Sequence, residues 1–548
     1  MGGTVVDGTG NPGFVADVVL EGDRIVAVRR PGEPPVEADE TIDASGSIVA
    51  PGFIDVHTHY DAQVLWDGDL TPSAWHGITT VVMGNCGFGI APTRPEGRET
   101  IVLTLENVEG MSAVALGEGI PWGFESFPEF LDEVDRRGKR LNVAALVGHT
   151  PVRLFVLGDE ASDRAATADE VATMSALVEE AVAAGALGFA SSKGAVHNGA
   201  HGKPVPSRLA DLEELVELTS AAGRAGARIA QCNVGPGLGV EELAEVSERS
   251  GTRICFTPLF ANGDGTAPDL MARVGDLPGD VWGQFGCRPI VMQIQMADPY
   301  PFGAIDAFAE ILSLPHDGRV ERYRDERWRE RARAGYDEWE ASGREPRLSR
   351  MLVAETELRP ELIGRAVPEL ATELGTHPVD VMLDLSEPED HRVRFTMVLA
   401  NHDTDEIAEL LHLPRAVVGL SDAGAHASQL CDAVFSTAMF QEWVRDRDVL
   451  TVEQAVHHLT GKPAEVFGLA ERGRLEPGGI ADVVVFSADD IAPEAPRREY
   501  DLPGGADRLV AGSKGIHHVF VNGVRVWADG APSSPGTLPG RLLRNGAG

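Results

Sequence analysis

The stretch from Gly52 to His59 reads Gly-Phe-Ile-Asp-Val-His-Thr-His, an apolar run that ends in a His-x-His pair. Alternate residues of an extended segment point to the same side, so the imidazoles of His57 and His59 can face one metal ion. An isolated His-x-His pair is weak evidence, because many such pairs are accidents of the surface. Its meaning depends on the strand pattern around it.

That pattern is an alternation of short runs rich in β-branched residues with amphipathic helices, which is typical of a parallel sheet wrapped in helices. Eight strand–helix units can be counted, so the sequence predicts an α/β fold with a (β/α)8 TIM-like barrel, whose active site lies at the C-terminal ends of the strands. The predicted strands lie near Ile48 to His57, Ile78 to Met83, Asn142 to Val147, Leu187 to Ser191, Arg228 to Asn233, Arg253 to Leu259, Pro289 to Gln295 and Ala416 to Leu420.

Two helix starts are marked by capping boxes, Thr167 with Glu170 and Thr451 with Gln454. Apolar residues recur on one face between Thr167 and Gly185, so this helix is expected to pack on the outside of the barrel and to end at the glycine.

Two regions fall outside the barrel. Residues 1–50 and 471–548 alternate like antiparallel strands, with a hairpin turn at Asn522-Gly523, and are expected to pair into one small β-sandwich. The barrel would span residues 51–470 and carry an insertion at about 260–395, between the seventh and eighth strands, which contains a charged helix from Arg319 to Trp339.

Composition narrows the class of protein. The formal charge of −38 disfavours nucleic acid and anionic lipid as partners, since both are bound through basic side chains. The apolar stretches are too short to span a bilayer, and no export signal precedes the first strand. Five scattered cysteines argue against a disulfide framework and for a cytoplasmic location. A small-molecule substrate is the expected partner, with homo-oligomerisation left open.

Motifs beyond the His-x-His pair recur along nearly the whole chain, although they are faint in the insertion. They are Pro51 to Asp61, Gly77 to Gly87, Gly185 to Phe189, Gly419 to His426, Leu459 to Leu469 and Arg472 to Asp482. In these motifs the sequence resembles the D-aminoacylase, or N-acyl-D-amino-acid deacylase, branch of the amidohydrolase superfamily. The family pattern begins with one further strand, which raises the alternative that the natural start lies upstream of Met1.

The resemblance implies a zinc-dependent hydrolase. His57 and His59 match the metal-binding pair, Cys86 matches a cysteine ligand characteristic of this branch, and Asp422 matches the carboxylate after the eighth strand. Asp422 would act as base and then acid, taking a proton from metal-activated water and returning it to the leaving amine. The alternatives are a helix N-cap for Asp422 and a small buried apolar residue for Cys86.

The chain departs from the family at strands five and six, which in deacylases each end in a metal-binding histidine. The corresponding residues read Ala-Gln-Cys-Asn-Val at 230–234 and Ile-Cys-Phe-Thr-Pro at 254–258. Cys232 could replace one histidine as a zinc ligand, or simply pack in the barrel. We therefore expect one well-occupied zinc ion, and a second ion rebuilt from Cys232 or a carbamylated Lys193 is the alternative.

Four further residues are candidates for binding substrate. His149 follows the third strand, Lys193 and His197 follow the fourth, and His426 closes the Gly419 to His426 motif. The carboxylate of an N-acyl amino acid would need a cationic partner, for which Lys193 and Arg394 are possibilities.

The expected reaction is hydrolysis of a linear amide, with an N-acyl-D-amino acid as substrate. The same site could instead cleave a cyclic amide, a carbamoyl group or an amide in a secondary metabolite, because fold similarity does not decide the bond. A non-catalytic barrel with an assembly or regulatory role is the alternative from another class. The retained His57, His59, Cys86 and Asp422 argue against it, since a scaffold needs none of them.

Overall fold

The computed structural model describes residues 1–548 except 35, 345, 529, 534–535 and 546–548. The chain divides into two units. The first contains Met1–Phe260, Asp264–Arg288 and Asp405–Gly548, and the second contains Ala261–Gly263 and Pro289–Thr404.

The first unit contains the barrel. Eight parallel strands pair in the order β5-β6-β7-β8-β9-β10-β11-β15, and a bridge between Thr58 and Ala423 joins the two ends of this sheet. The predicted (β/α)8 barrel is therefore confirmed. Its strands are β5 (Phe53–Asp55), β6 (Ile78–Met83), β7 (Asn142–Gly148), β8 (Gly188–Ser192), β9 (Ile229–Asn233), β10 (Arg253–Leu259), β11 (Val281–Phe285) and β15 (Ala416–Val418).

The first predicted strand, Ile48 to His57, is two strands. The segment β4 (Ile48–Pro51) belongs to a sheet formed by the chain ends, and only β5 belongs to the barrel. Gly52 lies at the junction, where a Cβ atom would come within 2.2 Å of the Thr79 side chain. Glycine is therefore required for the chain to pass from one sheet to the other at this point.

The assignment of Pro289 to Gln295 as the seventh barrel strand is wrong. The barrel uses β11, and β12 (Ile290–Gln295) pairs in a sheet of the second unit. Gly283 weakens the β pattern of β11. A Cβ atom there would lie 2.4 Å from Leu259, so packing requires the glycine. The second unit thus contains Ala261–Gly263 and the continuous stretch Pro289–Thr404.

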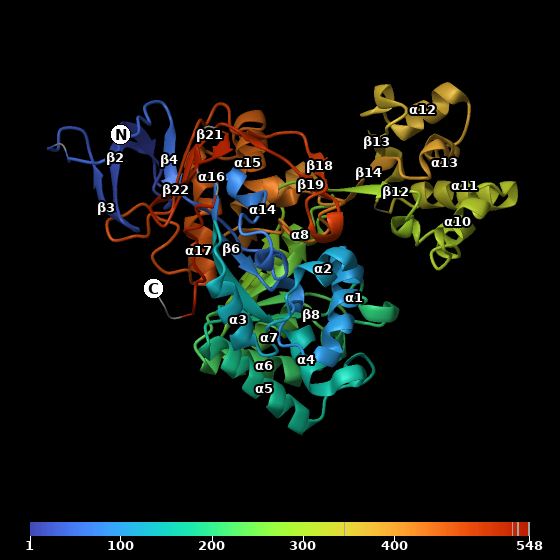
Figure 1. Cartoon of the computed structure of the whole chain (residues 1–548), viewed down its shortest axis with the longest axis horizontal. Helices are drawn as coiled ribbons and strands as arrows, with labels where there is room; N and C mark the ends of the chain where they lie inside the picture. The colour runs from blue at the N-terminus through green and yellow to red at the C-terminus, as the bar shows by residue number, and fades with distance from the viewer. Residues whose placement is uncertain (35, 345, 529, 534–535, 546–548) are drawn as a thin grey trace. The chain divides into compact units, whose positions relative to one another are not determined.

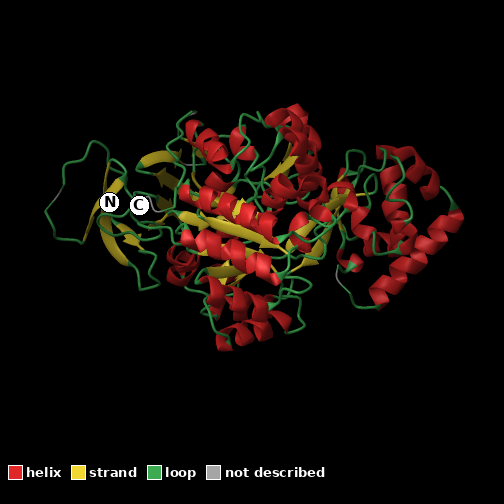
Figure 2. Cartoon of the chain, turned by 90° about the horizontal axis from the view of Figure 1, so that it is seen from below, coloured by secondary structure: helices red, strands yellow, loops and turns green. Residues whose placement is uncertain are grey.

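Helices flank the barrel strands (Figure 2). The connection from β5 to β6 contains only short 3-10 turns, so the prediction of a helix after every strand fails there. Both predicted capping boxes are present, at Thr167 and at Thr451. The α-helices of this unit are α1 (Arg98–Glu109), α2 (Ala113–Gly119), α3 (Phe127–Arg136), α4 (His149–Leu157), α5 (Ala168–Ala183), α6 (Leu212–Arg224), α7 (Val240–Ser250), α8 (Thr266–Asp276), α14 (Thr404–His412), α15 (Phe435–Met439), α16 (Val452–Leu459) and α17 (Gly461–Phe467).

Among its described residues, the second unit combines a three-stranded antiparallel sheet with five α-helices. The charged helix expected from Arg319 to Trp339 is two helices, because Asp325 accepts a hydrogen bond from the Arg327 amide and caps a new start. The elements are β12, β13 (Leu352–Glu355), β14 (Arg394–Ala400), α9 (Asp306–Ala309), α10 (His316–Tyr323), α11 (Glu326–Ala341), α12 (Val367–Leu374) and α13 (Pro378–Ser386).

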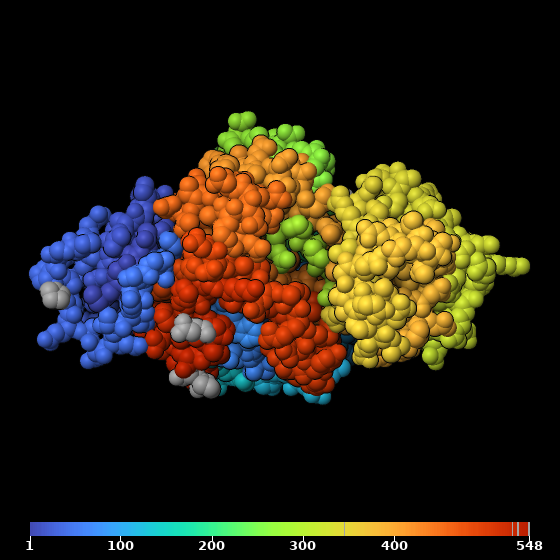
Figure 3. Space-filling model, turned by 90° about the horizontal axis from the view of Figure 1, so that it is seen from above, coloured from blue at the N-terminus to red at the C-terminus, as the bar shows by residue number. Residues whose placement is uncertain are grey.

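The two chain ends form one eight-stranded sheet, in the order β23-β22-β21-β16-β4-β1-β2-β3, and lie side by side in Figures 1 and 3. A bridge from Arg24 to Ile480 bends this sheet back on itself. The hairpin at Asn522-Gly523 has positive φ at both residues, as its sequence predicts. The strands are β1 (Gly3–Val5), β2 (Phe14–Glu21), β3 (Arg24–Arg29), β4, β16 (Val483–Phe486), β21 (Ile516–Val521), β22 (Val524–Ala528) and β23 (Ala531–Pro532).

Four short strands complete the C-terminal part in two pairs, β17 (Ala492–Pro493) with β20 (Ser513–Lys514) and β18 (Arg497–Glu499) with β19 (Arg508–Val510). Across the described part of the chain, no helix has both the length and the apolar character needed to cross a membrane.

Candidate metal centre

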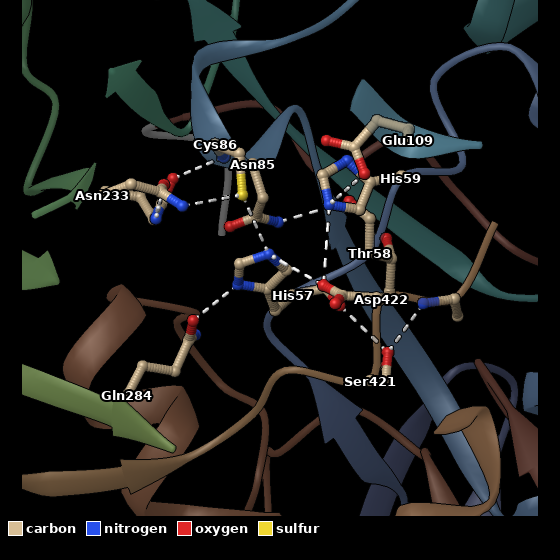
Figure 4. Close-up of polar contacts among 12 residues, drawn as sticks. His57, Thr58, His59, Asn85, Cys86, Glu109, Asn233, Gln284, Ser421 and Asp422 are labelled. Carbon is tan, nitrogen blue, oxygen red and sulfur yellow. Dashed lines mark hydrogen bonds and ion pairs between the residues drawn. The ribbon is translucent and has the colours of Figure 1, made fainter. Parts of the chain in front are cut away.

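Polar side chains converge where the first, second and eighth barrel strands end (Figure 4). His57 and His59 follow β5, Cys86 follows β6, and Asp422 follows β15. The carboxyl ends of parallel strands meet at one rim of a barrel, so residues far apart in the sequence become neighbours there. The structure brings together all four residues that the sequence assigns to the metal.

The distances fit a shared cation. The ligand atoms of His57, His59 and Cys86 lie within 4.8 Å of one another. Asp422 Oδ1 lies 3.2 Å from His57 Nε2 and 3.7 Å from His59 Nε2. The two histidines and the cysteine are buried, whereas 30% of the Asp422 side chain is exposed. Solvent and substrate can therefore reach the centre from the side of Asp422.

Residues of the barrel interior fix these side chains. Gln284 of β11 lies with Oε1 2.6 Å from His57 Nδ1, which leaves His57 Nε2 directed at the cluster. Asp55 accepts a 2.6 Å hydrogen bond from the Ser421 hydroxyl, whose oxygen also lies 2.9 Å from the His57 carbonyl oxygen. Ser421 thus joins the first strand to the loop that carries Asp422.

Cys86 is held by two amide side chains from the fifth strand. Its backbone N–H donates to Gln231 Oε1 at 2.6 Å, and Asn233 Nδ2 lies 3.3 Å from its sulfur. Side chains alternate along a strand, so Cys232, between these two, points to the opposite face.

The loops that carry Cys86 and Asp422 each contain a strained backbone conformation. Cys86 has φ 57° and Asp422 has φ 47°, in the left-handed region that non-glycine residues seldom occupy. Such residues gather at functional sites, where the surrounding structure holds them. Asp422 does not cap a helix in this loop, so the alternative reading as an N-cap is wrong.

The electrostatics favour a positive charge at the centre. Burial alone would lower the pKa of His59, but the neighbouring Glu109, Asp422 and Cys86 raise it well above its ordinary value. Burial lowers the pKa of His57 to about 4 and raises the pKa of the Cys86 thiol to about 11. These groups form an electron-rich pocket whose donors need a cation to become fully stabilised.

Zinc matches this donor set. Two imidazoles, one thiol and one carboxylate are the ligand types that zinc prefers, and His57 already presents Nε2 with Nδ1 held by an acceptor. The four residues His57, His59, Cys86 and Asp422 are therefore chemically suited to hold the ion.

Two predicted substrate-binding residues are engaged elsewhere. His149 begins α4, is buried, and contacts Ser191 Oγ through Nδ1 at 2.9 Å and Glu214 Oε1 through Nε2 at 2.8 Å. Lys193 Nζ donates to the backbone carbonyls of Arg208 and Ala210. In this structure both side chains therefore serve packing within the chain.

The surroundings of His197 and His426 are compatible with the substrate-binding role expected from the sequence. His197 Nδ1 contacts Ser192 Oγ at 2.6 Å, and His426 Nδ1 contacts Gln429 Oε1 at 3.3 Å, which leaves Nε2 of each ring for a ligand. Burial lowers the pKa of His197 to about 4, and the nearby charge of His59 acts in the same direction. Arg394 lies in β14 of the second unit.

Sequence reasoning missed Glu109, Gln284 and Asp55. Asp55 could have been found, since it alternates with His57 in the first motif and so shares its face. Gln284 was missed because the seventh strand was placed elsewhere. Glu109 carries no local signal, because it is one of several acidic residues in a helix.

The sequence is similar to a family model and to proteins of known activity. A family model described as "Amidohydrolase family" matches residues 40–235 and 331–532. D-aminoacylase of Alcaligenes xylosoxydans xylosoxydans is 30% identical over 555 residues, covering 99% of this chain and 96% of its own length. N-acyl-D-glutamate deacylase of the same organism is 31% identical over 553 residues, covering 100% of this chain and 96% of its own length.

Solved structures of proteins from the same group are similar to this chain over nearly its whole length. A crystal structure of D-aminoacylase aligns with a TM-score of 0.67 at 27% identity, over 99% of this chain and 98% of that chain. N-acyl-D-glutamate deacylase from Bordetella bronchiseptica, in complex with zinc and a phosphonate that mimics the tetrahedral intermediate, gives the same TM-score of 0.67 at 27% identity, over 99% and 98% of the two chains. For D-aminoacylase a binuclear metal centre is described, with activation by one metal and attenuation by the second.

Proposed function

Because the chain belongs to the amidohydrolase family, we propose that it is a zinc-dependent hydrolase that cleaves the linear amide bond of an N-acyl-D-amino acid. The resemblance drawn from the motifs is confirmed at the level of the family and of its deacylase branch. The observation that carries the proposal is the convergence of His57, His59, Cys86 and Asp422 on one point of the barrel rim.

Zinc held by these four residues would polarise the acyl carbonyl and make a water molecule acidic enough to attack at neutral pH. Asp422 is the proton carrier. Its carboxylate is partly exposed and beside both histidines, so it can take a proton from the attacking water. The charges of the histidines outweigh burial and hold the pKa of Asp422 below its ordinary value, so it is ionised and ready to accept.

The leaving amine needs that proton back. Asp422, once protonated, is the acid that can deliver it to the amine nitrogen, after which the carboxylate returns to its starting form. Ser421 keeps the Asp422 loop attached to the first strand through Asp55, which keeps the acid–base group next to the histidines. The protein therefore supplies the proton path from its own residues.

His197 and His426 are the substrate contacts in this proposal. Each ring uses Nδ1 for a contact within the chain, so Nε2 can donate or accept a hydrogen bond at the rim. The carboxylate of an N-acyl amino acid and the developing oxyanion are the two groups such donors would serve. His149 and Lys193 are not assigned to substrate in this proposal, because both ring nitrogens of His149 and two N–H groups of Lys193 contact groups within the chain.

Turnover on a panel of N-acyl-D- and N-acyl-L-amino acids, with zinc content measured on the same sample, tests the proposal. Release of free D-amino acid by the zinc-loaded protein, and its loss in Asp422→Asn, is the expected result. Hydrolysis of cyclic or carbamoyl amides alone would move the reaction to another bond. A zinc-loaded protein that cleaves no amide would favour a non-catalytic barrel.

A cytosolic location and self-association belong to the same proposal. All five cysteines are free, which suits a reducing compartment. Cell fractionation and size-exclusion chromatography would check these two points.

A further inference from the structure

Glu109 is a buried carboxylate at the edge of the metal centre. It is the last residue of α1 and only 4% exposed, and its Oε2 atom lies 3.5 Å from His59 Nε2 (Figure 4). Asp422 lies 3.7 Å from the same nitrogen. Two carboxylates therefore flank one imidazole nitrogen.

No hydrogen-bond donor of the described chain other than His59 lies within reach of the Glu109 side chain. A carboxylate removed from water is costly unless a cation or several donors compensate it. The side chain occupies a position that a bound cation would explain.

The fifth barrel strand adds no good zinc donor to the four residues His57, His59, Cys86 and Asp422. At the fifth strand the chain offers Gln231 and Asn233, whose amides hydrogen-bond to Cys86 and to each other. Amide side chains are poor zinc ligands, whereas a carboxylate is a common one. Glu109, beside His59, could add a zinc-binding oxygen.

The position of Glu109 is fixed by the loop that carries Asp422. The N–H of His426 donates to the carbonyl of Glu109 at 2.5 Å. Gly110 follows with φ 56°, and a Cβ atom there would lie 2.6 Å from His426 Nδ1. The close approach requires glycine, so the end of α1 is clamped against the Asp422 loop.

We propose that Glu109 is a ligand of the metal, completing a centre formed with His57, His59, Cys86 and Asp422. The inference rests on the proposed zinc site and adds one carboxylate oxygen to it, on the side of His59. The competing role is a simple ion pair with protonated His59, which would not bind metal.

The test uses Glu109→Gln, which keeps the shape and removes the charge, and Glu106→Gln, an exposed residue one turn earlier in α1, as a matched control. Zinc affinity is measured by competition with a chelator, and the visible spectrum of the cobalt-loaded protein reports the donors around the ion. Glu109→Gln should bind zinc at least about tenfold more weakly and change the cobalt spectrum, while Glu106→Gln matches the wild type. Unchanged affinity and spectrum in Glu109→Gln would overturn the proposal.

A second measurement covers the case in which Glu109→Gln does not fold. In a crystal structure of the zinc-loaded wild type, a Glu109 oxygen about 2.0–2.2 Å from zinc supports the proposal. A metal bound by the other residues, with Glu109 still paired to His59, refutes it. Failure of the proposed function looks different, because the wild type would then bind zinc through Glu109 but release no amino acid from any N-acyl substrate.

Discussion

The Nδ1 atom of His57 lies 2.6 Å from the Oε1 atom of Gln284, which joins the first barrel strand to the seventh. An amide oxygen can only accept, so the proton of the neutral imidazole is placed on Nδ1 and the lone pair on Nε2. The same Nε2 lies 3.2 Å from Asp422 and 3.3 Å from Cys86. Gln284 therefore orients a metal ligand without touching the metal.

Replacing this acceptor should weaken the centre. In Gln284→Leu we expect zinc affinity to fall about 10- to 100-fold with the fold retained, because residues that hydrogen-bond to metal-bound histidines have effects of this size. Gln284→Glu keeps an acceptor and should lose less. Chelator competition and circular dichroism measure the two quantities, and equal zinc affinity in Gln284→Leu and wild type would contradict the assigned role.

His57→Ala should remove the zinc itself. Losing one of a few donors that contact the ion costs much of the coordination energy, and His57 is central to the cluster. We expect a folded protein with little metal and no turnover. Metal analysis together with the deacylation assay checks this. Full zinc with full activity in the variant would mean that the metal is bound elsewhere.

Asp422→Asn should separate proton transfer from folding. The substitution keeps the shape but removes the base, so kcat should drop roughly a hundredfold or more while the melting temperature changes little. Steady-state kinetics on the best substrate of the panel provides the measurement. Near-normal turnover would exclude Asp422 as the proton carrier.

The role of Glu214 is expected to be structural. It bonds to His149 and Arg153, whose side chains are fully buried, so Glu214→Ala leaves a buried cation unpaired. Breaking such a pair costs about 3–5 kcal/mol. The neighbouring Glu213, whose side chain is 72% exposed in its pair with Arg249, is the control, and Glu213→Ala should cost at most about 1 kcal/mol. Denaturant unfolding compares them. Equal stability of the two variants would reject a structural role for the His149 network.

The barrel could be predicted because its strands repeat a pattern that local sequence carries. Seven of the eight predicted segments contain a barrel strand, and the exception is instructive. Gly283 interrupts β11 because Leu259 packs where its side chain would be, so tertiary packing removed the local β signal. A stronger β-branched run, at Ile290 to Gln295, lies in the second unit instead.

The sequence could predict a residue of the site only where a metal-binding side chain also stands in a recognisable pattern of spacing. The His57 and His59 pair follows from strand alternation, and Cys86 and Asp422 follow from motifs that the family shares. Gln284 and Glu109 come from other elements and reach the centre only in the folded chain. Cys232 is a possible zinc ligand by its side-chain type, but its place in the strand argues against that role. Alternation between Gln231 and Asn233 already turns it away from the rim.

The last prediction is that the chain binds one zinc ion rather than two. A second ion would need donors at the ends of the fifth and sixth strands, where the chain has Gln231, Asn233, Cys255 and Thr257. The two amides are already hydrogen-bonded to each other and to Cys86, and Cys255 packs in the hydrophobic core of the barrel.

Lys193, the residue that carbamylation would recruit, donates instead to backbone carbonyls of the loop after the fourth strand. A full second site therefore lacks both its histidines and its bridging group. Metal analysis should give about one zinc per chain, and added zinc should not raise this number at moderate excess. Anomalous scattering from a crystal provides the decisive check, because two full-occupancy ions less than about 4 Å apart, the spacing of a two-metal site, would contradict the prediction.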